Sequence, residues 1–146
     1  MNLFTMGFTR KSAEEFFTLI GENHIEILID IRLRNNTQFA GFTKSNDLAY
    51  FLKAICACRY VHEDAFAPNK ELLDDYKKQV TSWEKYESIY RSLYLKREMG
   101  ERFRKNYQRY NRVLLLCSEP TPEKCHRRLL AEYIGQDMEN IQIIHL

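Results

Sequence analysis

The residues most able to do chemistry lie in one short stretch, RVLLLCSEPTPEKCHRR, which runs from Arg112 to Arg128. Its apolar run at 113–117 is too short for an independent helix and long enough for a buried strand. A polar turn follows, and then a helical apolar pattern. In open α/β sheets such a junction lies at the carboxyl end of a strand, where ligands bind. Six side chains capable of chemistry gather there: Cys117, Ser118, Glu119, Cys125, His126 and Arg127.

The turn predicts where the helix starts. Residues 121–123, Thr-Pro-Glu, have the pattern of an N-cap, a proline at the first helical position and an acid in the first turn. A helix N-terminus carries free N–H groups and partial positive charge, so it suits an anion and lowers the pKa of a nearby cysteine. We therefore expect Arg127, Cys117 and Ser118 to take part in binding an anionic ligand.

The position of His126 favours a catalytic role. At about 100° per residue, it shares the apolar helix face centred on Leu129 but lies in the first turn, so its side chain points towards the strand ends. This favours an acid or base over a buried histidine bonded to a backbone carbonyl. Glu119 is a second acid–base candidate. For Cys125 and Cys117 the pattern favours simple apolar packing, and either is a candidate nucleophile only if its pKa is low.

Two further strands are expected to end at the same edge of the sheet. Asp30 and Arg32 follow the second predicted strand, and Gly7 and Thr9 follow the first. One interpretation is that Arg32 binds an anion while Asp30 orients it or acts as a base. The other is that this acid and base neutralise each other. Gly7 permits a close approach of backbone to a ligand.

Motifs for metals and cofactors are weak or absent. The pairs Cys56/Cys58 and Cys125/His126 lack the two-to-four-residue separation of structural zinc ligands. Neither the phosphate loop of nucleotide hydrolases nor the glycine fingerprint of dinucleotide sites occurs. No Cys-x5-Arg phosphatase loop follows Cys117. The sequence therefore predicts no metal and no cofactor.

A basic stretch offers a second kind of site. Between residues 91 and 112, arginines and lysines oppose only Glu98 and Glu101, with aromatic residues between them. Proteins bind single-stranded nucleic acid with basic side chains along its backbone and aromatic side chains stacked on its bases. The helical spacing of the aromatic residues favours the other interpretation, a solvated basic helix whose aromatic side chains pack inward. The candidate nucleic-acid contacts are Arg97, Arg102, Arg104, Lys105 and Arg109.

The apolar patterns predict a succession of strands and helices. Strands are expected at 3–6, 25–29, 58–62, 113–117 and 141–146. A helix capped by Ser12 follows the first strand, a polar loop covers 34–42, and Thr43 or Ser45 opens a second helix. The pattern is helical from 69 to about 109, with Gly100 separating two helices or kinking one, and Gly135 closes the last helix.

This succession predicts an α/β fold. A strand, a helix and a second strand form a unit with parallel pairing and a right-handed crossover. We expect a mostly parallel sheet of about five strands flanked by helices, with a helical insertion around 69–110. At 146 residues, the chain is expected to form a single domain over 1–146.

Composition excludes some classes of protein. The hydrophobic content of 45% argues against disorder, and no apolar run approaches the roughly 18–20 residues of a membrane span. The first residues lack the features of a signal peptide. Four cysteines in apolar contexts suggest reduced thiols, so we expect a cytoplasmic protein with no membrane contact. The net charge of +2 makes no strong statement about partners, and the oligomeric state is open.

Taken together, the motifs resemble an uncharacterised bacterial and archaeal family called domain of unknown function 488. The resemblance rests on residues 5–9, 28–32, 60–62 and 115–119, and on Cys125-His126-Arg127. Members of that family often have histidine or tyrosine where this chain has Phe8. The resemblance implies an α/β fold and a site at the strand ends, and implies no reaction.

The first hypothesis is an enzyme of unknown reaction that acts on an anionic substrate, nucleotide-like or nucleic-acid-like. Arg32 and Arg127 would bind charge, His126 would be the acid or base, and Asp30 and Glu119 would orient or share that role. The alternatives are a non-catalytic nucleic-acid-binding module using the basic 91–112 face, or a partner-binding domain whose polar rim is structural.

Overall fold

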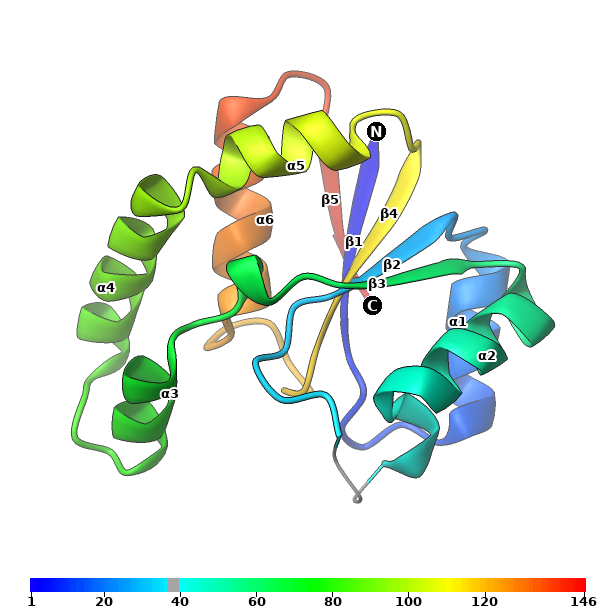
Figure 1. Cartoon of the computed structure of the whole chain (residues 1–146), viewed down its shortest axis with the longest axis horizontal. Helices are drawn as coiled ribbons and strands as arrows, with labels where there is room; N and C mark the ends of the chain where they lie inside the picture. The colour runs from blue at the N-terminus through cyan, green and yellow to red at the C-terminus, as the bar shows by residue number, and fades with distance from the viewer. Residues whose placement is uncertain (37–39) are drawn as a thin grey trace.

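The computed structural model describes residues 1–36 and 40–146, and within them the chain forms a five-stranded sheet in which every pairing is parallel (Figure 1). The strand order is β3-β2-β4-β1-β5. This confirms the predicted α/β class, and every predicted strand end lies within two residues of the observed one. Residues 37–39 of the predicted loop at 34–42 lie outside the described residues. The strands are β1 (Asn2–Gly7), β2 (Ile27–Asp30), β3 (Arg59–His62), β4 (Arg112–Cys117) and β5 (Gln142–His145).

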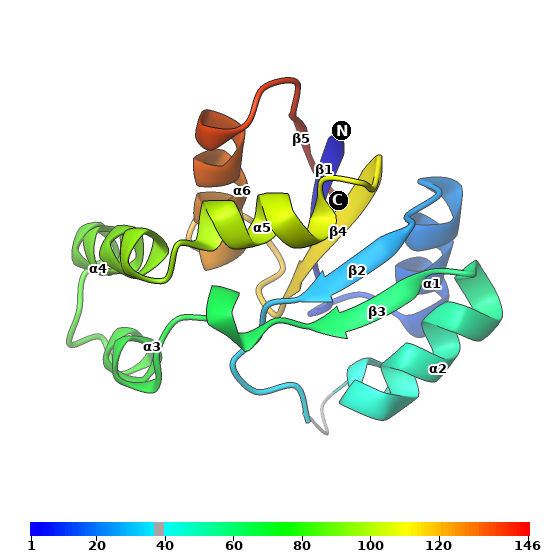
Figure 2. The same cartoon turned by 45° about the horizontal axis from the view of Figure 1, so that its top comes forward.

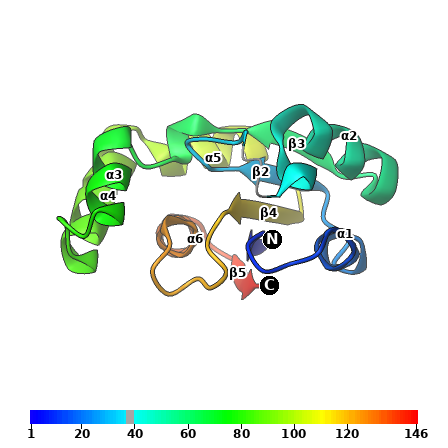
Figure 3. The same cartoon turned by 90° about the horizontal axis from the view of Figure 1, so that it is seen from below.

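Helices cover both faces of the sheet, so the fold has three layers (Figures 1 and 3). One face carries α1 (Ala13–Glu22) and α2 (Ser45–Cys56), and the other carries α6 (His126–Asp137). The insertion is helical, as predicted, and lies on the side of α6 (Figure 2). It consists of α3 (Lys70–Lys77), α4 (Trp83–Lys96) and α5 (Met99–Tyr107). Short 3-10 turns lie at Gly41–Thr43 and Asp64–Phe66. No helix of the described residues has the length and apolarity to cross a membrane.

The side chains of each strand point alternately into two apolar cores, because successive residues of a strand face opposite sides of the sheet. Ile29 and Leu115 belong to the core beneath α4, α5 and α6, whereas Leu28 and Leu114 belong to the core beneath α1 and α2. By the same alternation, Cys117 points to the side of α6. Asp30, which is in register with Leu116, points to the side of α1 and α2.

The order of the strands differs from the simplest expectation. The first strand, helix and second strand were expected to pair directly, but β4 lies between β1 and β2. Each of its residues from Val113 to Cys117 is buried, which suits a strand bonded on both sides. Gly7 pairs with Cys117 and Asp30 pairs with Leu116, so the three strands end at one level.

The last helix also differs from its prediction at both ends. It begins at His126 with Cys125 as N-cap, not at Thr121–Glu123. Residues 121–124 instead form a turn closed by a hydrogen bond from Cys125 N to Pro122 O. Gly135 lies inside the helix, where a Cβ would be 3.3 Å from the side chain of Ile143 on β5. The absence of a side chain at Gly135 therefore lets α6 pack closely against β5, and the glycine does not end the helix.

The insertion breaks at residues that were not expected to break it. Gln79 and Glu98 adopt positive φ of 60° and 51°, and they lie at the junctions between α3 and α4 and between α4 and α5. Gly100, the predicted breakpoint, lies inside α5, where a Cβ would clash with the Tyr94 hydroxyl at 2.5 Å. Side-chain packing rather than backbone conformation explains this glycine.

Gly7 allows the loop after β4 to approach the end of β1. A Cβ at this position would lie 1.6 Å from the carbonyl oxygen of Glu119, which is backbone and has no flexible side chain to move. The backbone of the same loop is tied to β1 by hydrogen bonds from Phe8 N to Cys117 O and from Thr9 N to Ser118 O. The predicted close approach at Gly7 is thus an approach to the protein's own loop.

We predict that Gly7→Ala lowers the free energy of unfolding by at least about 2 kcal/mol, because a buried backbone must move to accept the methyl group. Gly21→Ala is the matched control, since Gly21 lies in α1 and no atom of a neighbouring residue is within 4 Å of the place its methyl group would take. That variant is expected to gain up to about 1 kcal/mol from helix propensity. Urea unfolding measures both, and equal stabilities of the two variants would contradict the packing argument.

Candidate functional site

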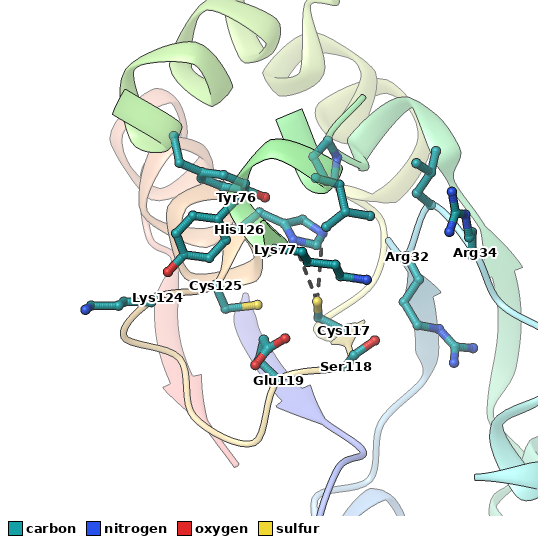
Figure 4. Close-up of a pocket in the computed structure, with 14 residues that line it drawn as sticks. Arg32, Arg34, Tyr76, Lys77, Cys117, Ser118, Glu119, Lys124, Cys125 and His126 are labelled. Atoms are coloured by element: carbon teal, nitrogen blue, oxygen red, sulfur yellow. Dashed lines mark hydrogen bonds between the residues drawn. The ribbon is translucent and has the colours of Figure 1, made fainter. Parts of the chain in front are cut away.

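A cleft of about 400 Å³ opens beside the carboxyl ends of β2 and β4 (Figure 4). Its floor includes Cys117, Cys125 and His126, and aromatic and aliphatic side chains of the insertion form one wall. Ligand sites of small molecules commonly have volumes of roughly 300–1,000 Å³. The other residues that line the cleft are Arg32, Leu33, Arg34, Pro68, Leu73, Tyr76, Lys77, Tyr86, Ser118, Glu119 and Lys124.

Two sulfur atoms and an imidazole meet at the floor of the cleft. The sulfur of Cys117 lies 3.7 Å from Nδ1 and 3.9 Å from Nε2 of His126. The ligand-type atoms of Cys117, Cys125 and His126 all lie within 4.8 Å of one another, and Figure 4 shows the two sulfurs beneath the ring. All three residues are at least 94% buried. The structure thus brings together three of the residues that the sequence selected.

The two thiols differ in pKa, and the shifts have opposite directions. A hydrogen bond from the Cys125 thiol lowers the pKa of Cys117, and the positive charge of Arg127 and the backbone N–H groups of Ser118 and Glu119 act in the same direction, against burial. The pKa of Cys125 is raised far above its ordinary value because its thiol donates to Cys117 and is itself buried. Cys117 is therefore the sulfur that more readily carries negative charge.

His126 is held by the backbone just after β2. Its Nε2 lies 3.0 Å from the carbonyl oxygen of Ile31, and its ring packs 5.7 Å from that of Tyr90. A carbonyl only accepts, so Nε2 must carry the hydrogen, and in the neutral ring Nδ1 is then an acceptor. The hydrogen bond to a carbonyl, considered in the sequence as an alternative to function, leaves the second nitrogen free to act at the cleft.

Arg127 is the largest fully buried side chain in the described part of the chain, with no solvent exposure. Its Nη1 donates to the carbonyl oxygen of Glu119 at 2.6 Å, which holds the loop after β4 against the helix. Within the described residues, its Nε and Nη2 have no hydrogen-bond partner. The guanidinium is not among the groups that line the cleft, so its charge acts on the cleft from behind the loop.

Asp30 and Arg32 form a buried pair on the opposite face of the sheet. Oδ1 of Asp30 accepts from Nε of Arg32 at 2.8 Å, and Oδ2 accepts from its Nη2 at 2.7 Å and from the Tyr60 hydroxyl at 2.8 Å. Arg32 also donates to the hydroxyl and carbonyl oxygens of Thr43. Arg32 borders the cleft, but Figure 4 shows its guanidinium turned away from the sulfurs. This geometry favours mutual neutralisation over a direct role in chemistry.

We predict that Asp30→Ala lowers the free energy of unfolding by about 3–5 kcal/mol, because it leaves the guanidinium of Arg32 buried without its partner. The control is Asp74→Ala, which breaks surface pairs with Lys70 and Arg34 and should change stability little. Thermal and urea unfolding of both variants provide the measurement. A loss at Asp30 no larger than the loss at Asp74 would show that the pair is not structural.

The remaining predicted residues lie around the mouth of the cleft or outside it. Ser118 and Glu119 line the cleft, and Glu119 is exposed. Gly7 and Thr9 do not line it, although both touch the loop that does. Sequence reasoning missed the cationic and aromatic residues that the insertion and the loop bring to the mouth. These are Arg34, Tyr76, Lys77, Tyr86 and Lys124.

Four of the five candidate cations of the basic stretch contact the protein itself, whereas Lys105 is exposed. Arg97 donates to the carbonyl oxygens of Ala65 and Ala67, and Arg102 pairs with Glu63 at 2.9 Å. Arg104 bonds to Glu101 and to the Asp137 carbonyl, and Arg109 lies over the ring of Tyr110. The aromatic residues Tyr90, Tyr94, Phe103 and Tyr107 are buried. This matches the inward-packing alternative, in which these rings are not available to stack on bases.

The chain belongs to the family described as Domain of unknown function DUF488, whose family model matches residues 12–134. The match covers most of the chain, including the cleft residues, and confirms the resemblance seen in the sequence. A search of curated proteins found no match, and neither did a search of solved structures. The family description assigns no activity.

Proposed function

We propose that this protein is an enzyme that acts on a small anionic substrate, phosphate-bearing or nucleotide-like, bound in the cleft at the carboxyl ends of β2 and β4. The observation that carries the proposal is the position of Cys117, Cys125 and His126, which are buried and yet form the floor of a cleft. Reactive side chains at the base of a concave site are typical of active sites.

The charges around the cleft favour an anion. Arg34, Lys77 and Lys124 line it, and Glu119 is the one carboxylate among the lining residues. The charge of Arg32 is already balanced by Asp30, so it adds little to this balance. Of the cations, Arg34 lies 4.0 Å from Asp74, which leaves the two lysines as the groups best placed to bind phosphate.

The walls suit a flat or partly apolar substrate. Tyr76 and Tyr86 line the cleft, with ring centroids 5.0 Å apart, and Leu73 and Pro68 lie on the same wall. Aromatic rings beside cations provide stacking and charge recognition in one site. A nucleotide has both features, and the cleft volume of about 400 Å³ fits a molecule of that size better than a nucleic-acid duplex.

The residues divide into three proposed roles. His126 moves a proton through Nδ1, since Nε2 is bonded to the Ile31 carbonyl. Glu119 is the second acid–base group, because it is the cleft's carboxylate. Lys77 and Lys124 bind the anion, in place of Arg32 and Arg127, whose guanidinium groups are buried and turned to the protein.

We predict that a thermal-shift screen of nucleotides, phosphosugars and short oligonucleotides finds a small phosphate-bearing ligand that stabilises the protein. A ligand at 100 times its dissociation constant adds about 2.7 kcal/mol, which corresponds to roughly 5–11 °C in a chain of this size. The variant Lys77→Ala with Lys124→Ala should lose most of this shift. Lys53→Ala with Lys85→Ala removes the same charge from exposed positions outside the cleft and should retain it.

Two results would contradict the proposal. Equal loss of the shift in both double variants would mean that net charge, and not the cleft, binds the ligand. Stabilisation by oligonucleotides alone, erased by salt and abolished by replacing Arg102, Arg104 and Lys105, would instead support the nucleic-acid-binding module.

A further inference from the structure

The three buried groups at the floor of the cleft also have the composition and spacing of a metal site. Each of Cys117, Cys125 and His126 offers one ligand atom, and these atoms lie within 4.8 Å of one another. In a tetrahedral zinc site with Zn–S of about 2.3 Å and Zn–N of about 2.0–2.1 Å, neighbouring ligand atoms are roughly 3.5–3.8 Å apart. The separation of 3.7 Å between the Cys117 sulfur and Nδ1 of His126 falls in this range.

The hydrogen bonding of His126 matches that of a metal ligand. Metal-bound histidines almost always donate their other ring N–H to a carbonyl or carboxylate, which fixes the tautomer. Here Nε2 lies 3.0 Å from the Ile31 carbonyl oxygen, and Nδ1 is the nitrogen closer to the sulfur of Cys117. The carbonyl just after β2 therefore leaves Nδ1 as the nitrogen available to a metal. Because the Cys117 sulfur is almost equally far from both ring nitrogens, the ring has to turn slightly for Nδ1 to face a metal held by that sulfur.

The donor set indicates which metal fits. Two thiolates and an imidazole are soft and borderline ligands, which favour zinc over magnesium or calcium. Among the described residues, no other histidine, cysteine or acidic side chain joins this group. Three protein ligands leave a fourth position, which is the pattern of catalytic rather than structural zinc. All three ligands line the cleft, so that position faces the proposed substrate.

The buried charge of Arg127 is consistent with an anion at the fourth position. The guanidinium has no carboxylate partner within the described residues, and its Nε and Nη2 make no hydrogen bond there. A zinc ion with two thiolates is neutral, and an added hydroxide or substrate oxygen gives the centre a charge of −1. A buried cation beside such a centre is balanced, whereas a buried cation alone is costly.

We propose that Cys117, Cys125 and His126 bind a zinc ion whose fourth position opens into the cleft. The site deepens the proposed function: its use in catalysis rests on that function, although zinc binding itself does not. With zinc on Nδ1, His126 is a metal ligand and no longer the group that moves a proton, so the acid–base role falls to Glu119. Sequence reasoning missed the site because it compared adjacent ligand pairs, whereas here seven residues separate the two cysteines and the loop between them closes the gap.

The test is the metal content of the untagged protein, purified without chelators and then loaded with zinc and dialysed. We expect about one zinc per chain by mass spectrometry of the metal. Cys125→Ser and His126→Gln should each weaken zinc binding at least ~10-fold. The control variant Cys56→Ser with Cys58→Ser changes two cysteines that lie outside the cluster, and it should bind zinc like the wild type.

A second measurement does not depend on how the variants fold. Cobalt(II) added to the wild-type protein should give a thiolate-to-cobalt charge-transfer band and the intense visible bands of tetrahedral cobalt. Less than about a tenth of an equivalent of zinc, or a cobalt spectrum without the thiolate band, would overturn the proposal. So would a Cys117–Cys125 disulfide found in all of the protein prepared under reducing, anaerobic conditions.

The zinc proposal and the proposed function can be contradicted separately. Lys77→Ala with Lys124→Ala should retain zinc while losing the phosphate-bearing ligand. A wild-type protein that binds this ligand but no zinc would remove the metal proposal and leave the proposed function. A protein that binds zinc in the cluster but none of the screened anions would remove the proposed function and leave the metal proposal.

Discussion

The backbone of β4, hydrogen-bonded to β1 on one side and β2 on the other, is the constraint on which the cleft depends. Because all pairings are parallel, the three strands end at one level, and the chain must leave β4 through the loop at 118–125. That loop can pack against the end of β1 only because Gly7 has no side chain. The guanidinium of Arg127 donates a hydrogen bond to the Glu119 carbonyl of the same loop. The positions of Cys117, Cys125 and His126 follow from these contacts.

Alternation along the strands sorts the polar residues at the sheet edge into two groups with different environments. Cys117 points towards α6 and meets His126, whereas Asp30 points towards α2 and meets Arg32. One group is open to a cleft, and the other is enclosed by Thr43, Tyr60 and Phe8. The Cys117–His126 group and the Asp30–Arg32 group thus lie at the same edge of the sheet but on opposite faces of it.

Much of this arrangement could be predicted from local patterns. The apolar run before Cys117, the first-turn position of His126 and the capping of α1 by Ser12 are short-range signals, and the structure contains all three features. The insertion of β4 between β1 and β2 could not be predicted in this way, because strand order depends on contacts far apart in the sequence.

The misread signals have physical explanations of the same kind. Thr121-Pro122-Glu123 suits a turn as well as a helix start, and the turn occurs because the loop must first pass over Gly7. Gly100 and Gly135 looked like helix ends but are places where a helix lies close to Tyr94 or Ile143. Lys77 and Lys124 could not be assigned to the cleft, because one comes from the insertion and the other from the loop.

The stacking of Trp83 on Tyr86 gives the cleft an optical reporter. The two rings lie nearly parallel at 16°, with centroids 5.1 Å apart, and Tyr86 forms part of the cleft wall. Trp83 is the single tryptophan in the chain, so the protein's tryptophan emission comes from one place, a single ring away from the cleft. Anything that enters the cleft and shifts Tyr86 changes the surroundings of that indole, and the native chain reports its own occupancy without an attached dye.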